Sequence, residues 1–330
     1  MPWNGMNSMS TVVVFHDLPI ESVLRGRRDD LEIVAVRSNE EAYEALETAD
    51  MFVVNPANWD DSFVDRLDGG NWVQTTSAGY DVFPLARLRE RGVTLTNAGG
   101  NYAPVVSEHA FAMMLALSRK LPTLLDRQYE RIWDRSIGLD MTDWAERTMT
   151  VLGLGTIGEA IARKGVGFDM TVYGVKRRPD EYDGCLPSGR VLSPEQLPSV
   201  LPVTDVLIVI VPLTDETYHL VDAETFDQLS DTAILINVAR GSVVDEEALL
   251  AALGDGSIAA AGLDVFESEP LPAESPLWAR DDVLVTPHVA GRSDRFAERF
   301  ASLFYENYDR RTRGVRLQNA IVEPDPDGAA

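Results

Sequence analysis

A short run of glycines in the middle of the chain restricts its fold more than any other feature. Residues 149–152 form an apolar, strand-like segment that runs directly into Gly153-Leu-Gly155-Thr-Ile-Gly158, and helix-forming residues follow. In such a Gly-x-Gly-x-x-Gly motif the first glycine allows a tight turn, the second admits a phosphate and the third permits close helix–strand packing. The N-terminus of the helix then offers N–H groups to an anion. The motif alone is weak evidence, but a second apolar strand at 170–175 supports a dinucleotide site here.

The same alternation of apolar strands and helices continues through the second half of the chain. The strands predicted there are 148–152, 171–175, 206–211, 233–237, 259–263 and 283–286. Ser193-Pro-Glu-Gln196 is typical of a helix start, with an N-cap serine and proline at the first helical position. Strands joined by helical crossovers predict a doubly wound parallel sheet.

The first hundred residues show a second α/β pattern. Strands are predicted at 11–15, 31–36, 51–54, 72–75 and 93–96. Ser38-Asn-Glu-Glu41 indicates a helix that opens with a capping box. The sequence therefore predicts two Rossmann-like or flavodoxin-like α/β domains.

The segments that join and follow these patterns are less regular. Residues 97–101 are expected to be a flexible connection, and 105–121 a long buried helix that stops before Pro122. Residues 129–144 show no clear period. A helix is predicted over 293–311, and the acidic, proline-rich end of the chain is expected to be disordered.

The charge of the chain is unusual. Asp and Glu number 53 against 29 Lys and Arg, and the formal net charge is −24. Lysine occurs only at Lys120, Lys164 and Lys176. Carboxylates at this density repel one another unless salt screens them, so we expect a halophilic protein, although an ordinary acidic enzyme remains an alternative. The same charge argues against nucleic acid as a partner.

The remaining composition indicates a soluble, cytoplasmic protein. Cys185 is the only cysteine, so no intrachain disulfide is possible. Residues 1–10 lack the basic and apolar segments of a signal peptide, and no stretch of ~18 apolar residues predicts a membrane span.

Three polar stretches follow strands of the second half, at the carboxyl edge where open α/β sheets bind their ligands. They carry Arg240, Glu269 and His288. An imidazole beside a carboxylate is a tunable acid/base, and an arginine grips a carboxylate with two parallel hydrogen bonds. Each residue also has a structural interpretation. Arg240 could be a helix-capping cation or part of a surface ion pair, and His288 a core histidine. Glu269 could be a solvated loop acid, which is also how Glu267 is interpreted. Their joint occurrence in this order favours a functional site.

These stretches carry a resemblance to a known family. Asn-Val-Ala-Arg-Gly at 237–241, Asp-Val-Phe-x-x-Glu-Pro at 264–270, Thr-Pro-His-Val-Ala-Gly at 286–291 and Val-Pro-Leu-Thr-Asp-Glu-Thr at 211–217 resemble signatures of the D-isomer-specific 2-hydroxyacid dehydrogenases. The resemblance spans roughly residues 72–317.

The resemblance implies a domain organisation and a reaction. Residues 1–102 with 292–330 would form the substrate domain and 103–291 the dinucleotide-binding domain, with a cleft between them and a homodimer interface near 105–121. The enzyme would reduce a 2-keto acid to the D-2-hydroxy acid with hydride from C4 of the nicotinamide. Arg240 would orient the keto acid, His288 would donate the proton, and Glu269 would hold His288 and keep it charged.

The residues expected to contact ligands fall into two sets. The cofactor-binding set is Gly153, Gly155, Thr156, Ile157, Gly158, Lys176, Arg177, Arg178, Val211, Pro212, Thr217, Val238, Ala239, Asp264 and His288. The substrate-binding set is Asn55, Ala78, Gly79, Tyr80, Tyr102, Arg240 and His288. No metal site is expected.

Some of these roles are implied in detail by the resemblance. The N–H groups of Ala78 and Gly79 would bind the substrate carboxylate, and Asp264 would hold the nicotinamide carboxamide. Residues 55–59 could shape the substrate pocket, with Trp59 as easily a packing residue.

The other three histidines match no catalytic position of the family. His109 is interpreted as helix core, and His16 and His219 as ordinary surface or edge histidines.

The residues after the second strand of the nucleotide unit predict which cofactor is preferred. NAD-binding relatives of this fold carry an acid there for the ribose hydroxyls. This chain has Lys176, Arg177 and Arg178, and no acid before Asp180. A 2′-phosphate would gain charge-assisted hydrogen bonds from these side chains, so we expect NADPH to be preferred and NADH to be used less well. The alternative is a solvated basic turn.

Two classes of function remain open at this point. One is the reductase, and the other is a nucleotide-sensing regulator of the co-repressor kind on the same fold. A 3-phosphoglycerate dehydrogenase is less favoured because many carry an additional regulatory domain. A formate dehydrogenase would have glutamine where this chain has Glu269. The sequence leaves the natural 2-keto acid open.

Overall fold

The computed structural model describes residues 9–17 and 20–323. Most of the segment tested for a signal peptide and the acidic end expected to be disordered lie outside these residues. The chain divides into two compact units, Met1–Tyr102 with Ser293–Ala330, and Ala103–Arg292.

The first unit is built on a six-stranded sheet with the order β13-β5-β4-β3-β1-β2. Its strands are β1 (Ser10–Phe15), β2 (Leu31–Val36), β3 (Met51–Val54), β4 (Trp72–Thr75), β5 (Thr94–Thr96) and β13 (Ala320–Val322). All pairs are parallel except β13, which runs antiparallel to β5. The order 2-1-3-4-5 of the parallel strands is that of flavodoxin-like folds.

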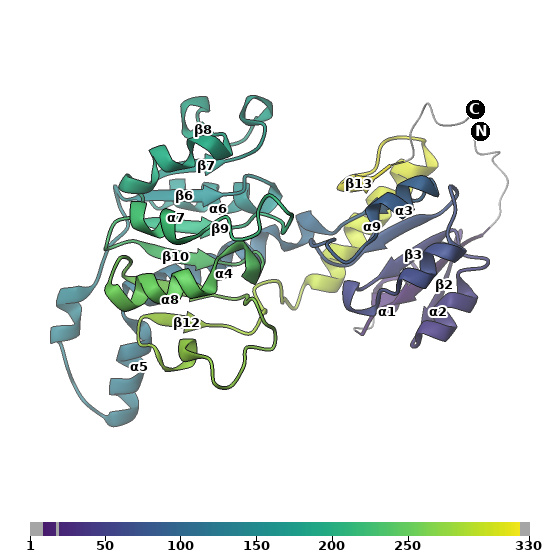
Figure 1. Cartoon of the computed structure of the whole chain (residues 1–330). Coiled ribbons are helices and arrows are strands. Elements are labelled where there is room, and N and C mark those ends of the chain that lie inside the picture. The colour runs from purple at the N-terminus through teal and green to yellow at the C-terminus, as the bar shows by residue number, and fades with distance from the viewer. Residues whose placement is uncertain (1–8, 18–19, 324–330) are drawn as a thin grey trace. The chain divides into compact units, whose positions relative to one another are not determined.

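Helices cover both faces of this sheet (Figure 1). They are α1 (Ile20–Leu24), α2 (Asn39–Ala45), α3 (Leu85–Glu90) and α9 (Phe296–Thr312), with 3-10 turns η1 (Pro56–Asn58) and η2 (Asp61–Arg66). On one face α1 and α9 pack against Trp72, whose ring stacks on Phe304 at 5.1 Å. On the other, α2 and α3 enclose a cluster that contains Phe52 and Phe63. Strand β3 is buried along its whole length, as expected for a central parallel strand.

The second unit is built on a seven-stranded sheet with the order β12-β11-β10-β9-β6-β7-β8. Its strands are β6 (Thr148–Leu152), β7 (Thr171–Val175), β8 (Val191–Leu192), β9 (Val206–Val209), β10 (Ile234–Asn237), β11 (Ala260–Leu263) and β12 (Val283–Val285), all paired in parallel. This is the Rossmann order with one further strand at an edge. The predicted class of two parallel-sheet α/β domains is confirmed.

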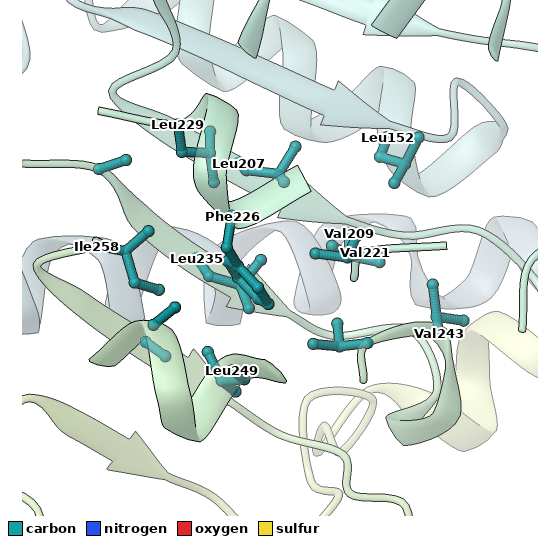
Figure 2. Packing of buried hydrophobic residues seen from close by; sticks show 14 of the residues in the cluster. Leu152, Leu207, Val209, Val221, Phe226, Leu229, Leu235, Val243, Leu249 and Ile258 are labelled. Carbon is teal, nitrogen blue, oxygen red and sulfur yellow. The ribbon is translucent and has the colours of Figure 1, made fainter. Parts of the chain in front are cut away.

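Helices of the second unit lie on both faces of its sheet, with α7 and α8 in front and α4 and α6 behind in Figure 1. Its helices are α4 (Gly99–Ser118, which begins in the first unit), α5 (Leu121–Glu130), α6 (Thr156–Gly167), α7 (Ala223–Gln228) and α8 (Glu246–Asp255). Its 3-10 turns are η3 (Ser136–Asp140), η4 (Pro179–Glu181), η5 (Ser188–Arg190), η6 (Pro194–Ser199), η7 (Leu201–Val203), η8 (Gly241–Val243) and η9 (Pro276–Ala279). Figure 2 shows Phe226 of α7 beside Leu235 of β10, within the core that also includes Leu249 of α8.

Several local predictions need correction. The helix expected at 105–121 begins at Gly99, so residues 99–101 are helical rather than a flexible connection. It ends at Ser118 because Lys120 adopts a left-handed conformation with φ of 54°, and Pro122 lies in the first turn of α5. Helix α5 was not predicted, because none of its residues is buried and its pattern does not mark a core face.

Both predicted helix starts are present, but the hydrogen-bond partner at the first and the type of helix at the second differ from the prediction. The Ser38 side chain accepts a hydrogen bond from the Glu41 N–H, as expected, but Glu41 accepts in return from the Arg37 N–H. The capping box at Ser193 opens the 3-10 helix η6 rather than an α-helix. Among the described residues no helix is long and apolar enough to cross a lipid bilayer.

Candidate active site

The glycine motif joins β6 to α6, and its three glycines have different surroundings. Gly153 has a φ of 113°, and a Cβ there would lie 2.6 Å from the Ile210 carbonyl oxygen. A Cβ on Gly158 would lie 1.8 Å from the Gly153 carbonyl oxygen, whereas a Cβ on Gly155 would meet nothing within 4 Å. Gly153 and Gly158 therefore permit close backbone packing, and Gly155 leaves open space before the helix.

The start of α6 suits an anionic ligand. Its N-cap residue is Gly155, which has no side chain to bond the first N–H groups, and Thr156 beside it is exposed. Orphan N–H groups and the helix dipole at such an end attract a phosphate. The residues present therefore fit a dinucleotide, which when bound supplies a hydride from C4 of its nicotinamide ring.

The basic run follows β7, the strand next to β6. The Lys176 ammonium lies 5.8 Å from the centroid of the Tyr182 ring, and Arg178 pairs with Glu181 at 3.0 Å. The Arg178 side chain is 75% exposed, and Arg177 is also exposed. The run thus presents cations to solvent at the carboxyl edge of the sheet, one strand away from the glycine motif.

The other expected cofactor residues lie on loops at the same edge. Val211 and Pro212 follow β9, and the Thr217 hydroxyl donates to the Pro212 carbonyl at 2.6 Å, which folds that loop back on itself. Val238 and Ala239 follow β10, where the Ala239 N–H donates to the Asn237 side chain at 3.1 Å.

Arg240, Glu269 and His288 follow β10, β11 and β12, which are neighbouring strands of the sheet. His288 Nδ1 lies 2.7 Å from Glu269 Oε2, and Glu269 Oε1 accepts from the Phe266 N–H at 3.1 Å. The side chains of His288 and Glu269 are 50% and 35% exposed. The pair is therefore both oriented and open to a reactant.

A cavity of about 480 Å³ borders this pair within the second unit. Its lining is mostly apolar: Phe266, Pro270, Leu271, Trp278, Val285 and Pro287 surround it with Glu269 and His288. Apolar surroundings strengthen the interaction between an imidazolium and a carboxylate.

Arg240 is oriented by its own loop. One of its Nη atoms donates to the Ala239 carbonyl at 2.7 Å, and the Asn237 amide donates to the Arg240 carbonyl at 3.1 Å. These bonds tie the side chain and the main chain of Arg240 to the turn after β10.

Asp264 organises the loop that ends in the histidine. Its side chain is 1% exposed, and its two oxygens accept from the Thr286 hydroxyl at 2.6 Å and from the Val289 and Ala290 N–H groups at 2.9 Å. The His288 N–H donates to the Asp264 main-chain carbonyl at 2.8 Å. The role on the carboxamide that the resemblance implied stays a prediction, whereas support of the His288 loop is observed.

Two histidines differ from their sequence interpretation. His109 Nε2 lies 2.9 Å from the Thr286 hydroxyl and 3.6 Å from Asp264 Oδ1, so it contributes to this network as well as to the helix. No spacing in the sequence indicated that contact. His16, interpreted as a surface or edge residue, is buried, with its ring 6.1 Å from that of Phe296.

Of the expected substrate residues of the first unit, Asn55 follows β3 and the run 78–80 follows the neighbouring strand β4, whereas Tyr102 lies in α4. The Gly79 N–H donates to Ser77 Oγ at 3.1 Å, and the Tyr102 hydroxyl donates to the Thr76 carbonyl at 2.7 Å, which places Tyr102 beside the loop of Ala78 and Gly79. Asn55 caps η1 after β3.

The two aromatic candidates near these loops have packing roles. Trp59 packs among Phe52, Phe63 and Phe83, and Tyr80 packs against the same core.

Fold and site together are those of a nicotinamide-dependent dehydrogenase, and comparison with known proteins agrees. The profile described as "D-isomer specific 2-hydroxyacid dehydrogenase, NAD binding domain" matches residues 111–290. The chain is 34% identical over 284 residues to glyoxylate/hydroxypyruvate reductase B of Yersinia pestis, covering 85% of this chain and 86% of that protein.

Solved structures give the same result. A D-isomer-specific 2-hydroxyacid dehydrogenase family protein from Aeromonas salmonicida has a TM-score of 0.80 at 34% identity, covering 95% of this chain and 99% of that one. A D-isomer-specific 2-hydroxyacid dehydrogenase from Xanthobacter autotrophicus Py2, in complex with NADPH and MES, has a TM-score of 0.78 at 32% identity, with coverages of 94% and 98%. This chain belongs to the D-isomer-specific 2-hydroxyacid dehydrogenase family and is an NAD(P)-dependent dehydrogenase.

Proposed function

We propose that this enzyme reduces a 2-keto acid to the D-2-hydroxy acid, with NADPH as the preferred hydride donor. The observation that carries the proposal is the 2.7 Å contact between His288 Nδ1 and Glu269 Oε2. It fixes the orientation of the ring and directs Nε2 away from Glu269. His288 protonated in this way is a general acid for the keto oxygen as hydride arrives at the carbon.

The other residues have complementary roles. Arg240 grips the substrate carboxylate and the carbonyl oxygen, and Glu269 stabilises the charged form of His288 by its opposite charge. The Ala78 and Gly79 N–H groups of the first unit bind the substrate carboxylate, which replaces Ser77 Oγ as the acceptor of the Gly79 N–H. The glyoxylate and hydroxypyruvate named for the Yersinia pestis relative make these two small 2-keto acids the first to assay.

The cofactor preference is proposed from the run Lys176, Arg177 and Arg178. We expect a higher kcat/KM for NADPH than for NADH, and a loss of about five- to tenfold with NADPH alone in Arg177→Ala and Arg178→Ala, because each removes an exposed charge-assisted bond. Consumption of NADPH and NADH is followed at their absorbance with glyoxylate, hydroxypyruvate, pyruvate and longer aliphatic keto acids. Molar salt is expected to lower the ratio of kcat/KM for NADPH to that for NADH, because it screens the attraction between exposed cations and the 2′-phosphate.

The loss of an exposed arginine elsewhere in the chain serves as the control for this test. Arg313→Ala removes an exposed arginine of the first unit and should leave both cofactors unaffected. A wild type that favours NADH, or arginine variants that lose nothing with NADPH, would contradict the cofactor assignment. Tight binding of the dinucleotide without turnover of any keto acid would favour the nucleotide sensor instead.

The net charge of −24 supports a second proposal, that the enzyme is a halophilic homodimer. Exposed apolar side chains gather on and after α5, among them Leu125, Tyr129 and Trp133. Association of two such acidic chains needs screening, and the Debye length falls from ~30 Å at 0.01 M to ~3 Å at 1 M salt. We therefore expect the melting temperature, the activity and the dimer mass by light scattering all to decline together on dialysis from molar KCl to ~10 mM. Full activity of an unchanged dimer in low salt would contradict the proposal.

A further inference from the structure

The loop that carries Glu269 lies directly against the residue that follows Arg240. A Cβ on Gly241 would be 1.8 Å from the Phe266 carbonyl carbon and 2.3 Å from the Glu267 nitrogen. The main chains of the two loops are therefore in contact, with no side chain between them. The separation between Arg240 and Glu269 depends on this contact, because each residue lies within three positions of it.

The side chain of Glu267 ties this loop to two other segments of the second unit. Its Oε1 lies 2.8 Å from His219 Nε2 and accepts from the Glu246 N–H, at the start of α8, at 3.1 Å. Glu267 is thus held in place by two groups that lie outside its own loop. The sequence interpretation of Glu267 as a solvated loop acid, and of His219 as an ordinary histidine, overlooked this pairing.

His219 is itself fixed on the neighbouring segments. Its main-chain N–H donates to the Ser242 carbonyl at 2.8 Å, and its ring stacks on that of Tyr218 with 4.0 Å between the centroids. Its ring atom Nδ1 lies 3.6 Å from Asp245 Oδ2. Asp245 in turn caps α8 by accepting from the Ala248 N–H. The two ring nitrogens thus face two different carboxylates, so the imidazole lies between Glu267 and Asp245.

Acidic groups lie around this ring. Asp245 and Glu267 face the two nitrogens, and the Glu246 carboxyl is close enough that burial and the charge of Glu267 raise its pKa. The imidazole thus lies between two carboxylates and contacts the nearer one, Glu267, at 2.8 Å.

We propose that His219 is a positioning residue for catalysis: through Glu267 it holds the 266–269 loop against Gly241 and so fixes the spacing between Arg240 and the Glu269–His288 pair. The inference rests on the catalytic roles proposed above. It adds a residue that touches neither substrate nor cofactor and acts through Glu269.

The test is a double-mutant cycle with keto-acid reduction as its readout. His219→Phe keeps the stacking on Tyr218 and removes both ring nitrogens, and displacement of the Glu269 loop should lower kcat by about tenfold to a hundredfold. His219→Gln, whose amide still donates to Glu267, should regain part of this loss. In a Glu269→Gln background His219→Phe should change kcat by less than about twofold, because residues that act through one another are not additive.

Matched controls separate positioning from general stability. Arg147→Gln breaks an ion pair of 2.8 Å with Asp205 at the amino ends of β6 and β9, away from the carboxyl ends that carry the site, and should leave kcat unchanged. Hydrogen–deuterium exchange should accelerate in 264–270 but not in 148–152 when His219 becomes phenylalanine. Three results would each overturn the proposal. The first is a wild-type kcat in His219→Phe, and the second is a double variant whose loss of kcat equals the product of the two single losses. The third is unchanged hydrogen–deuterium exchange in 264–270. If the wild-type enzyme reduced no keto acid, the proposed function would fail, and exchange in 264–270 alone would decide the positioning role.

Discussion

Replacement of His288 by alanine is expected to lower kcat for keto-acid reduction by about 10²–10⁴-fold, the range typical of a lost general acid. The physical reason is that the keto oxygen gains negative charge as hydride arrives, and no other group is assigned to protonate it. Cofactor affinity should fall much less than kcat, because His288 is only one of the expected cofactor contacts and the glycine motif with the start of α6 lies on another strand connection. Single-turnover kinetics and dinucleotide fluorescence measure the two quantities separately.

The backbone at His288 calls for a second variant. Its φ is 50°, in the left-handed region that asparagine tolerates better than alanine. His288→Asn therefore removes the acid with less backbone strain and should lose kcat to a similar degree. A near-normal kcat in both variants would mean that the proton comes from elsewhere.

The partner of the histidine offers an independent check of the same role. Glu269→Gln keeps a hydrogen-bond partner 2.7 Å from the ring but removes the negative charge beside it, so kcat for keto-acid reduction should fall while cofactor affinity changes little. A wild-type kcat in Glu269→Gln would remove Glu269 from this role.

The second sheet could be predicted because its strands follow a strong physical pattern. Central parallel strands such as β9 and β10 are buried on both faces and read as continuous apolar runs. Strand β8 was not predicted, because two residues, Val191–Leu192, carry too little pattern. Helix α5 was also not predicted, because no buried face marks it.

The site could be predicted as far as strand order determines it. Glu269 and His288 follow neighbouring strands, so their contact is a consequence of topology. The pairing of His219 with Glu267 could not be inferred in the same way, because it joins side chains 48 positions apart from two loops whose conformations depend on the whole unit. The contact of His109 with Thr286 could not be inferred either, since helical periodicity indicates only that His109 belongs to the core.

Replacement of Arg240 by lysine should lower kcat/KM for the keto acid by about 10- to 150-fold, the equivalent of one charge-assisted hydrogen bond, while leaving the cofactor dissociation constant nearly unchanged. Lysine keeps the charge and hence the long-range attraction of the substrate. It loses the planar fork that can bond a carboxylate in parallel and at the same time bond the Ala239 carbonyl, as Arg240 does at 2.7 Å. The lysine ammonium cannot reach the substrate carboxylate and the Ala239 carbonyl with ideal geometry at the same time. The keto carbon would therefore be poorly aligned to receive the hydride.

Arg280→Lys is the matched control for this substitution. Arg280 forms a fork on Asp282 in the same unit, with Nε and Nη2 at 2.8 and 2.6 Å from the two carboxylate oxygens. The same exchange of arginine for lysine there should lower the melting temperature slightly and leave kcat/KM near wild type. Equal losses in keto-acid and cofactor binding by Arg240→Lys would indicate a misfolded loop, and a kcat/KM within about twofold of wild type would contradict bidentate grip, because the loss of a charge-assisted bond exceeds that range.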